Sequence, residues 1–207
     1  ASSVGALGFL DAGEALAAGV RPFKLEKATE TRNACPYCAV ACGVLIYSIA
    51  DGTAKDAKYD VVSSGRTGHA EAVEITFDPR VVSFGTILQV YFSVAHNPTE
   101  LNRQGPDVGP QYRSTIFAAS PEQRKVAEAY IAQLDNAKVY DRPIATRIDD
   151  LEAFYAAEDY HQDYATLHPT QPYIAFYDRP KVENLKRLFP ALARNMPVLS
   201  KNSPPKS

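Results

Sequence analysis

The sequence predicts an α/β protein in which a mixed β-sheet is flanked by helices, an α+β sandwich with long ordered coils. Three observations support this class. Residues 71–77 alternate as a half-buried strand does, residues 83–95 carry a helical apolar stripe, and Ser120-Pro-Glu-Gln123 is typical of a helix start. Strands and helices are interleaved along the chain, which favours layers packed around one core.

The first elements come from residues 71–95. Val73, Ile75 and Phe77 form the apolar side of the strand, which ends at Asp78-Pro79. In the helix that follows, Ser83 is the predicted amino-terminal cap. The apolar positions of this helix are Phe84, Ile87, Leu88, Tyr91 and Phe92.

The later elements alternate in the same way. Residues 111–118 predict a second strand, and the helix that begins at Ser120 runs to about residue 134. Further along, we expect a third strand at 143–148, short helices at 158–167 and 180–188, and a strand-like apolar step at 173–176.

Length and composition fit one globular domain with a short appendage, and we expect a monomer. The chain has 207 residues, of which 45% are hydrophobic and 22% charged, and its formal net charge is -2. The chain lacks the excess of basic residues that would indicate binding to nucleic acid or to an anionic membrane. The apolar stretches are shorter than the roughly 18 residues of a membrane span.

The first 20 residues are small and weakly apolar and need not fold. Two interpretations stand side by side. They are the tail of an export signal that ends near Ala18, or an Ala/Gly-rich disordered leader. The first predicts a periplasmic protein and the second a cytoplasmic one.

Three cysteines lie close together at Cys35, Cys38 and Cys42. Thiolates at this spacing are typical of iron–sulfur ligation, although a four-iron cluster needs a fourth ligand and no cysteine follows Cys42. Cys35-Pro-Tyr-Cys38 also matches a redox dithiol, but the residues before it make a poor strand. A third interpretation is that the three thiols have no chemical role beyond adventitious metal binding.

The setting of these cysteines, Thr-Arg-Asn-Ala-Cys-Pro-Tyr-Cys-Ala-Val-Ala-Cys-Gly43, resembles the amino-terminal cluster motif of molybdenum-dependent formate dehydrogenases. The resemblance covers residues 1 to about 57. A glycine-bearing stretch at 51–58 is the natural junction with the next part. We therefore predict a leader and cysteine segment at 1–57, a main domain at 58–191 and a disordered tail at 192–207.

Three further segments form a matched set: Ser64-Gly-Arg-Thr-Gly-His-Ala-Glu-Ala-Val73, Gln104-Gly-Pro-Asp-Val-Gly-Pro-Gln-Tyr-Arg-Ser114 and Ala157-Glu-Asp-Tyr-His-Gln-Asp-Tyr164. In this order and at these separations they resemble the peptide methionine sulfoxide reductase A family. The resemblance implies a mixed sheet flanked by helices, and reduction of the S-epimer of methionine sulfoxide in peptides and proteins as a repair of oxidative damage. It also implies thioredoxin or a chemical dithiol as reductant, and no metal or organic cofactor.

The resemblance assigns roles to four residues. Glu71 matches the acid that protonates the sulfoxide oxygen, and partial desolvation at the start of an apolar strand raises a carboxyl pKa toward a useful value. Tyr59 and Tyr112 match two phenols that hydrogen-bond this oxygen, and Asp107 matches the aspartate that positions the site. Spacing alone favours a surface carboxylate for Glu71 and a core aromatic for each tyrosine.

Other residues of the matched motifs are interpreted as scaffold. His69, His161 and Asp163 are expected to make structural hydrogen bonds, and Arg113 is expected to be a structural ion-pair partner rather than a catalyst. None of the histidine, cysteine and aspartate sets in this half has metal-ligand spacing.

The family's nucleophile is a cysteine in a Gly-Cys-Phe-Trp stretch, and this chain contains neither that stretch nor any tryptophan. The expected first strand and helix are replaced by the cysteine segment, with residues 44–49 in the vacant strand position. We therefore expect a chimeric reductase body with a degenerate active site and little or no activity. One alternative is a non-enzymatic binder that still recognises oxidised methionine weakly through the oxygen site, although loss of the apolar cage argues against useful affinity. The others are an iron–sulfur electron-transfer fragment that uses the three cysteines, and a non-catalytic product of gene rearrangement.

Overall fold

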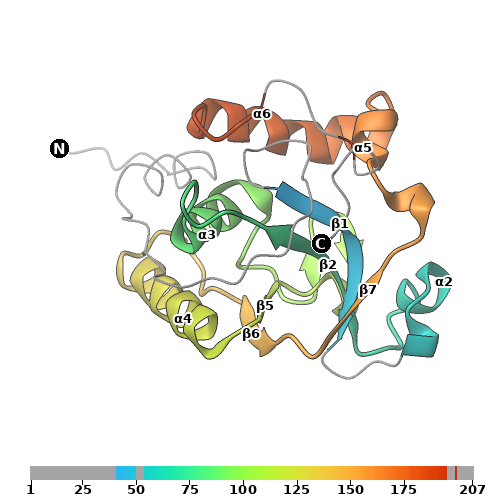
Figure 1. Ribbon diagram of the computed structural model, residues 1–207, viewed down its shortest axis with the longest axis horizontal. Coiled ribbons are helices and arrows are strands. Elements are labelled where there is room, and N and C mark those ends of the chain that lie inside the picture. Colours follow the sequence, from blue (N-terminus) through green and yellow to red (C-terminus); the bar gives the residue numbers. More distant parts are fainter. Residues whose placement is uncertain (1–40, 50–53, 195–198, 200–207) are drawn as a thin grey trace.

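The computed structural model describes residues 41–49, 54–194 and 199 (Figure 1). The leader at 1–20, Cys35, Cys38 and the last residues of the predicted tail lie outside the described residues.

A three-stranded antiparallel sheet contains the first strands of the described chain. Its central strand is β1 (Ala41–Ile49), with β2 (His69–Thr76) on one side and β7 (Ala153–Ala156) on the other. The register places residue 47 opposite both Glu71 and Tyr155. A strand is therefore present where residues 44–49 predicted one, and it brings two distant segments together.

Strand β2 confirms the strand predicted at 71–77 and begins two residues earlier. Ile75 and Phe77 pack against a buried cluster as predicted. Val73 was predicted on the same apolar side, but it is 55% exposed. The helices that cover this face pack against Ile75 and Phe77, and Val73 is not part of that cluster.

A separate parallel pair consists of β5 (Thr115–Ala118) and β6 (Arg147–Asp150), with Ile116 opposite Ile148. Helix α4 (Pro121–Asn136) lies in the connection between them, as a parallel pair requires. Both strands begin later than the predicted residues 111 and 143. The chain first forms the 3₁₀ turn η3 (Pro110–Tyr112), and the Ala145 amide donates to the Pro98 carbonyl of a loop at 2.7 Å.

The two main predicted helices are confirmed with their caps. The first is α3 (Phe84–Val90), continued by one π-helical turn, η2 (Tyr91–Ala95), and Ser83 Oγ accepts from the Thr86 amide at 3.1 Å. The second is α4, where Ser120 Oγ accepts from the Gln123 amide at 3.2 Å. Both caps satisfy amides that a helix leaves without partners in its first turn.

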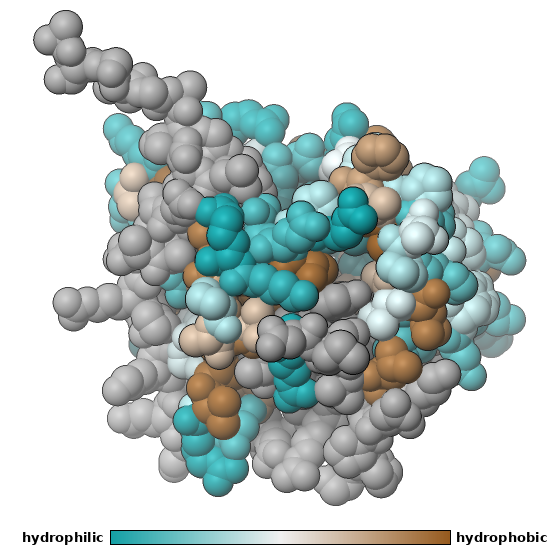
Figure 2. Space-filling view, turned by 90° about the horizontal axis from the view of Figure 1, so that it is seen from above, coloured by the Kyte–Doolittle hydropathy of each residue, from teal (hydrophilic) through white to brown (hydrophobic). Residues whose placement is uncertain are grey.

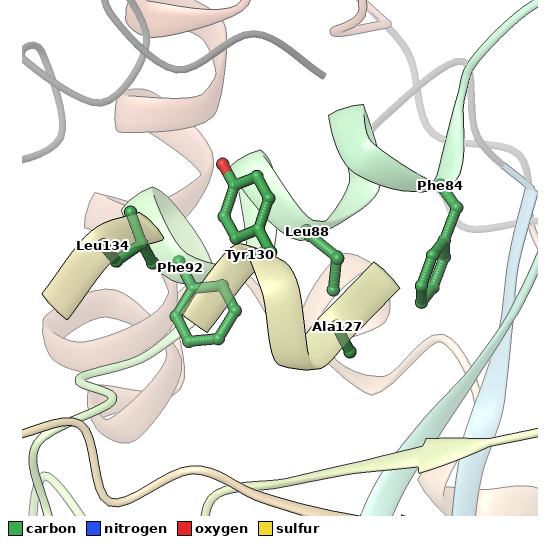
Figure 3. Packing of buried hydrophobic residues seen from close by; sticks show 6 residues of the cluster. All are labelled: Phe84, Leu88, Phe92, Ala127, Tyr130 and Leu134. Carbon is green, nitrogen blue, oxygen red and sulfur yellow. The ribbon is translucent and has the colours of Figure 1, made fainter. Parts of the chain in front are cut away.

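The largest buried cluster lies between these two helices (Figure 3). The first helix and its π-helical turn contribute three side chains and α4 contributes three more, so the helices contact each other along their apolar stripes. The six residues are Phe84, Leu88, Phe92, Ala127, Tyr130 and Leu134. Phe92 and Tyr130 stack with ring centroids 5.7 Å apart.

A second buried cluster joins α6 (Arg179–Leu188) to α3, to its continuation η2 and to β2. Leu185 and Phe189 pack there with Val82, Ile87 and Val94. Leu192 and Ala193 extend this packing past the predicted domain end at 191. Seen from above, the face along which α6 runs in Figure 1 is largely hydrophilic, with hydrophobic residues in small separate groups (Figure 2).

Two predicted elements near the carboxyl end differ from the structure. Residues 158–167 are not one helix but η4 (Asp159–His161) and α5 (Tyr164–Leu167), because Asp163 between them has a left-handed φ of 59°. The strand-like step at 173–176 is helical. It belongs to the π-helical η5 (Ile174–Asp178), which continues into α6. A short apolar run does not distinguish a strand from a buried helix turn.

The described chain also contains several short elements. They are η1 (Ala54–Asp56), α2 (Tyr59–Val62) and a hairpin of β3 (Arg103–Gln104) and β4 (Asp107–Val108). Within the described ranges, no helix has the length and apolar character needed to cross a membrane.

Candidate functional site

Glu71 lies on β2, with its side chain partly buried. Burial raises the pKa of Glu71, a hydrogen bond with Tyr112 lowers it, and the charge of Asp107 raises it, so that the net direction is upward. Its Oε1 is buried and has no hydrogen-bond partner among the described residues. The carboxyl is therefore biased toward its protonated form and has an oxygen open to a further interaction.

Tyr112 ends η3 and faces the same carboxyl. Burial, followed by the negative charges of Glu71 and Asp107, raises the pKa of Tyr112 to about 12, against a smaller lowering by a hydrogen bond with Gln111. The phenol therefore stays protonated throughout the neutral range and keeps a proton to donate.

Tyr59 begins α2 and is 41% exposed. It is close enough to Tyr112 to contribute to the raised pKa of that phenol. Residues of the third matched segment position it, because Glu158 Oε1 accepts from the Tyr59 amide at 3.0 Å and the His161 ring lies 4.7 Å from the Tyr59 ring. The structural hydrogen bond that we expected from the His161 ring is not among the described contacts: its Nε2 lies 3.8 Å from Glu158 Oε2, and its ring contacts Tyr59.

Asp107 in β4 completes the predicted set, and the structure adds a residue that we did not predict. The Tyr173 hydroxyl donates to Asp107 Oδ2, and burial together with this hydrogen bond raises the pKa of Tyr173. Tyr173 follows Pro172 in a segment that we interpreted as a strand-like step. A single tyrosine beside apolar residues has no sequence signal that separates it from a core aromatic.

Two further motif residues, His69 and Arg113, contact other parts of the fold. The buried His69 ring meets Tyr155 edge-on at 6.0 Å, in agreement with a scaffold role. Arg113, for which we expected an ion pair, donates to three backbone carbonyls, those of Gly68, His69 and Pro110, at 2.9–3.1 Å.

A metal centre is not seen in the described part of the chain, where no three His, Cys, Asp or Glu side chains gather to hold an ion. The backbone of Cys42 is part of β1, whereas Cys35 and Cys38 lie outside the described residues. The predicted cysteine site therefore stays a prediction.

The four predicted residues thus come from α2, β2, β4 and η3, and electrostatic coupling links them as one group. The Tyr112 phenol and a carboxyl with a raised pKa are donors suited to a polar oxygen that gains negative charge or a proton. The fold is α/β, and a group of this kind is suited to general-acid chemistry on an oxygen.

Comparison with known proteins identifies the family of this chain. The profile of the family described as peptide methionine sulfoxide reductase matches residues 43–191, and the chain belongs to that family. Peptide methionine sulfoxide reductase MsrA 2 of Mesorhizobium japonicum is 62% identical over 148 residues, which cover 72% of this chain and 76% of the relative. MsrA of Thermus thermophilus is 40% identical over 176 residues, which cover 82% of this chain and 98% of the relative.

A solved structure agrees with the assignment. Reduced Mxr1 from Saccharomyces cerevisiae superposes with a TM-score of 0.58 at 30% identity, over 64% of this chain and 74% of the yeast chain. The family match begins at Gly43 rather than near residue 58, so most of β1 lies inside it. The resemblance of residues 1–57 to formate dehydrogenases has no support in these matches.

Proposed function

We propose that this chain recognises methionine S-sulfoxide in peptides and proteins through an oxygen site made by Glu71, Tyr59, Tyr112 and Asp107. The observation that carries the proposal is the buried Oε1 of Glu71, without a partner in the described structure and next to a phenol that keeps its proton. A sulfoxide oxygen is a strong acceptor and fits such a group of donors.

The corresponding reaction transfers the oxygen to a thiol. A cysteine thiolate attacks the sulfoxide sulfur while Glu71 protonates the oxygen. The sulfur–oxygen bond then breaks and the oxygen leaves as hydroxide. Hydroxide attacks the cysteine sulfur while the new sulfur–sulfur bond breaks, which leaves methionine as a thioether and the cysteine as a sulfenic acid. Two further thiols, from thioredoxin or a chemical dithiol, reduce the sulfenic acid and release water.

We further propose that this chain performs the reaction slowly or not at all. Its sequence contains no Gly-Cys-Phe-Trp stretch, and its three cysteines are Cys35, Cys38 and Cys42. Without the Phe-Trp pair, the apolar cage for the substrate methyl group is also missing. Iron–sulfur electron transfer by these cysteines, or a rearrangement product without a selected function, are the alternative proposals.

The decisive experiment is turnover of a peptide with methionine S-sulfoxide, with dithiothreitol as reductant. The R-sulfoxide peptide is the stereochemical control, and a Cys35→Ser/Cys38→Ser/Cys42→Ser variant is assayed in parallel. We expect no turnover above the variant. S-specific turnover that disappears in the variant would show that one of the three cysteines acts as nucleophile, and the proposed inactivity would be wrong.

Binding is measured separately by calorimetry with the same peptides. We expect the S-sulfoxide peptide to bind more tightly than the unoxidised peptide, and Glu71→Ala to weaken it about tenfold, since one donor to the oxygen is lost. Equal binding of oxidised and unoxidised peptide would reject the oxygen site. An anaerobic absorbance spectrum tests the iron–sulfur alternative, because a bound cluster is brown.

A further inference from the structure

We propose that Gln111 and Arg113 are positioning residues that hold Tyr112 against Glu71. The proposal rests on the oxygen site described above and adds the residues that set its geometry. Gln111 and Arg113 flank Tyr112 in the chain, and both side chains bind backbone of residues 63–69, the segment that leads into β2.

The guanidinium of Arg113 joins the two segments directly. Its Nη2 donates to the Gly68 carbonyl at 2.9 Å, and its Nη1 donates to the His69 carbonyl at 3.1 Å and to the Pro110 carbonyl at 2.9 Å. Gly68 and His69 lie three and two residues before Glu71, and Pro110 begins the turn that ends with Tyr112. One rigid planar group therefore fixes the distance between the acid and the phenol.

Gln111 makes a second connection on the other side of Tyr112. It is only 4% exposed, and its Nε2 donates to the Ser63 carbonyl at 3.1 Å. The side-chain amide of Gln111 lies against two glycines. A Cβ added to Gly65 would lie 3.0 Å from Gln111 Oε1, and a Cβ added to Gly109 would lie 2.3 Å from it. Both glycines have positive φ, 70° and 150°, so side chains are excluded there by conformation as well as by space.

The geometry separates a positioning role from an electrostatic one. The causes of the shifted Glu71 pKa are burial, Tyr112 and Asp107, and the guanidinium charge is not among them. If Arg113 acts by position, its loss lets η3 move away and water reach Glu71. Loss of the Tyr112 hydrogen bond alone would raise the Glu71 pKa, but burial is the larger cause of the shift, so renewed hydration makes the Glu71 pKa fall. If it acted by charge, the loss of a nearby cation would raise the Glu71 pKa.

The test is a carbon-13 NMR titration of the Glu71 carboxyl, assigned with Glu71→Gln, in the full chain and four variants. The variants are Arg113→Ala, Arg113→Lys, Gln111→Ala and, as a matched control, Arg103→Ala. Arg103 is an exposed arginine whose Nε also donates to a backbone carbonyl, that of Gly105 at 2.7 Å, but it makes no connection to β2. Near-ultraviolet circular dichroism verifies that each variant is folded.

We expect the Glu71 pKa to fall in both Arg113 variants and in Gln111→Ala, and to stay unchanged in Arg103→Ala. Lysine keeps the charge but not the planar fork, so a fall in Arg113→Lys supports positioning. An unchanged or raised Glu71 pKa in Arg113→Lys and Gln111→Ala overturns the proposal, and these two variants decide it if Arg113→Ala does not fold.

Affinity for the S-sulfoxide peptide is measured alongside, and we expect each positioning variant to weaken it about tenfold. Unchanged affinity in folded variants counts against the proposal. If the parent chain does not bind the peptide, the proposed function fails, while the titration still decides whether Gln111 and Arg113 position Tyr112 and Glu71.

Discussion

Glu71 and Tyr112 both have raised pKa values, and for both residues burial is the first cause. A buried carboxyl resists ionisation because its charged form loses hydration, and a phenol beside two carboxylates resists it further. Both groups therefore carry protons at a higher pH than exposed groups do. This is what a site that binds and protonates an oxygen requires.

The raised Glu71 pKa also has a consequence for stability. A group whose pKa is higher in the folded state stabilises the fold fully below its unfolded pKa, and this contribution is lost as the pH rises through the folded pKa. We therefore expect Glu71→Gln to have a higher melting temperature than the parent at pH 8, with the gain absent at pH 4. Differential scanning calorimetry at the two pH values measures this.

The control for this comparison is Glu74→Gln, on the same strand but on its opposite face. We expect a smaller gain there at pH 8. Equal gains for the two variants would mean that loss of charge in general, and not burial of Glu71, is responsible.

At the scale of elements, the predictions that succeeded depend on local interactions. Ser83 and Ser120 cap the two helices where their side chains were expected to do so, since a cap bonds an amide only three residues away. The apolar stripe from Phe84 to Phe92 likewise faces the core. A helix of this kind is specified by residues within a few turns of one another.

The predictions that were wrong at this scale concern segments whose partners are distant. Residues 111–114 fit a strand, but the turn at η3 brings Arg113 back to the carbonyls before β2. The step at 173–176 fits a strand as well as a helix turn. There the Ile174 amide donates to the side-chain Oε1 of Gln171, and the Ala175 amide donates to the backbone carbonyl of Gln171, four residues earlier, as in a helix.

The cap of α4 allows a direct measurement of a local interaction. Ser120→Ala removes the acceptor of the Gln123 amide, and we expect it to cost about 1 kcal/mol of the free energy of unfolding, or roughly 2–4 °C of melting temperature. Ser120→Asp keeps an acceptor and is expected to stay near the parent. Similar losses for both variants in thermal denaturation would contradict a capping role.

At the scale of the molecule, a buried polar network connects the end of η2 with the residues directly before β5 and β6. His96 Nε2 lies 2.7 Å from Ser114 Oγ, which lies 2.7 Å from Thr146 Oγ1, and His96 Nδ1 lies 3.1 Å from the Tyr91 carbonyl. Burial lowers the pKa of His96 to about 4, with a further lowering from the Lys181 charge and a partial offset by the Tyr91 bond. His96 is therefore neutral in the folded protein.

This histidine predicts a loss of stability in mild acid. Because its folded pKa is depressed, its contribution is fully present above the unfolded pKa of about 6.5 and is lost as the pH falls toward 4, up to about 3 kcal/mol. We expect His96→Gln to flatten this dependence, measured as the free energy of urea unfolding at pH 7 and pH 4.5. His168→Gln, at an exposed histidine, serves as control, and parallel pH profiles for the parent and His96→Gln would contradict the prediction.

The residues of the proposed oxygen site came from motifs, and their grouping came from the fold. Glu71, Tyr59, Tyr112 and Asp107 stand in segments whose order and separation resemble one family, and the family match agrees. Nothing in the local sequence around Tyr173 indicates that it reaches Asp107, 66 residues away in the chain. The same holds for the carbonyls that Arg113 binds, which lie 44 and 45 residues before it.

Local sequence was sufficient for the helix caps, the apolar stripes and the strand at β2, because each depends on residue type and on neighbours within a few positions. Three features depended on the folded chain: the central place of β1, the clamp of Gln111 and Arg113 around Tyr112, and the bond between Tyr173 and Asp107. These contacts join segments far apart in sequence. They form only when packing of the whole core brings the segments together and offsets the chain entropy lost in closing long loops.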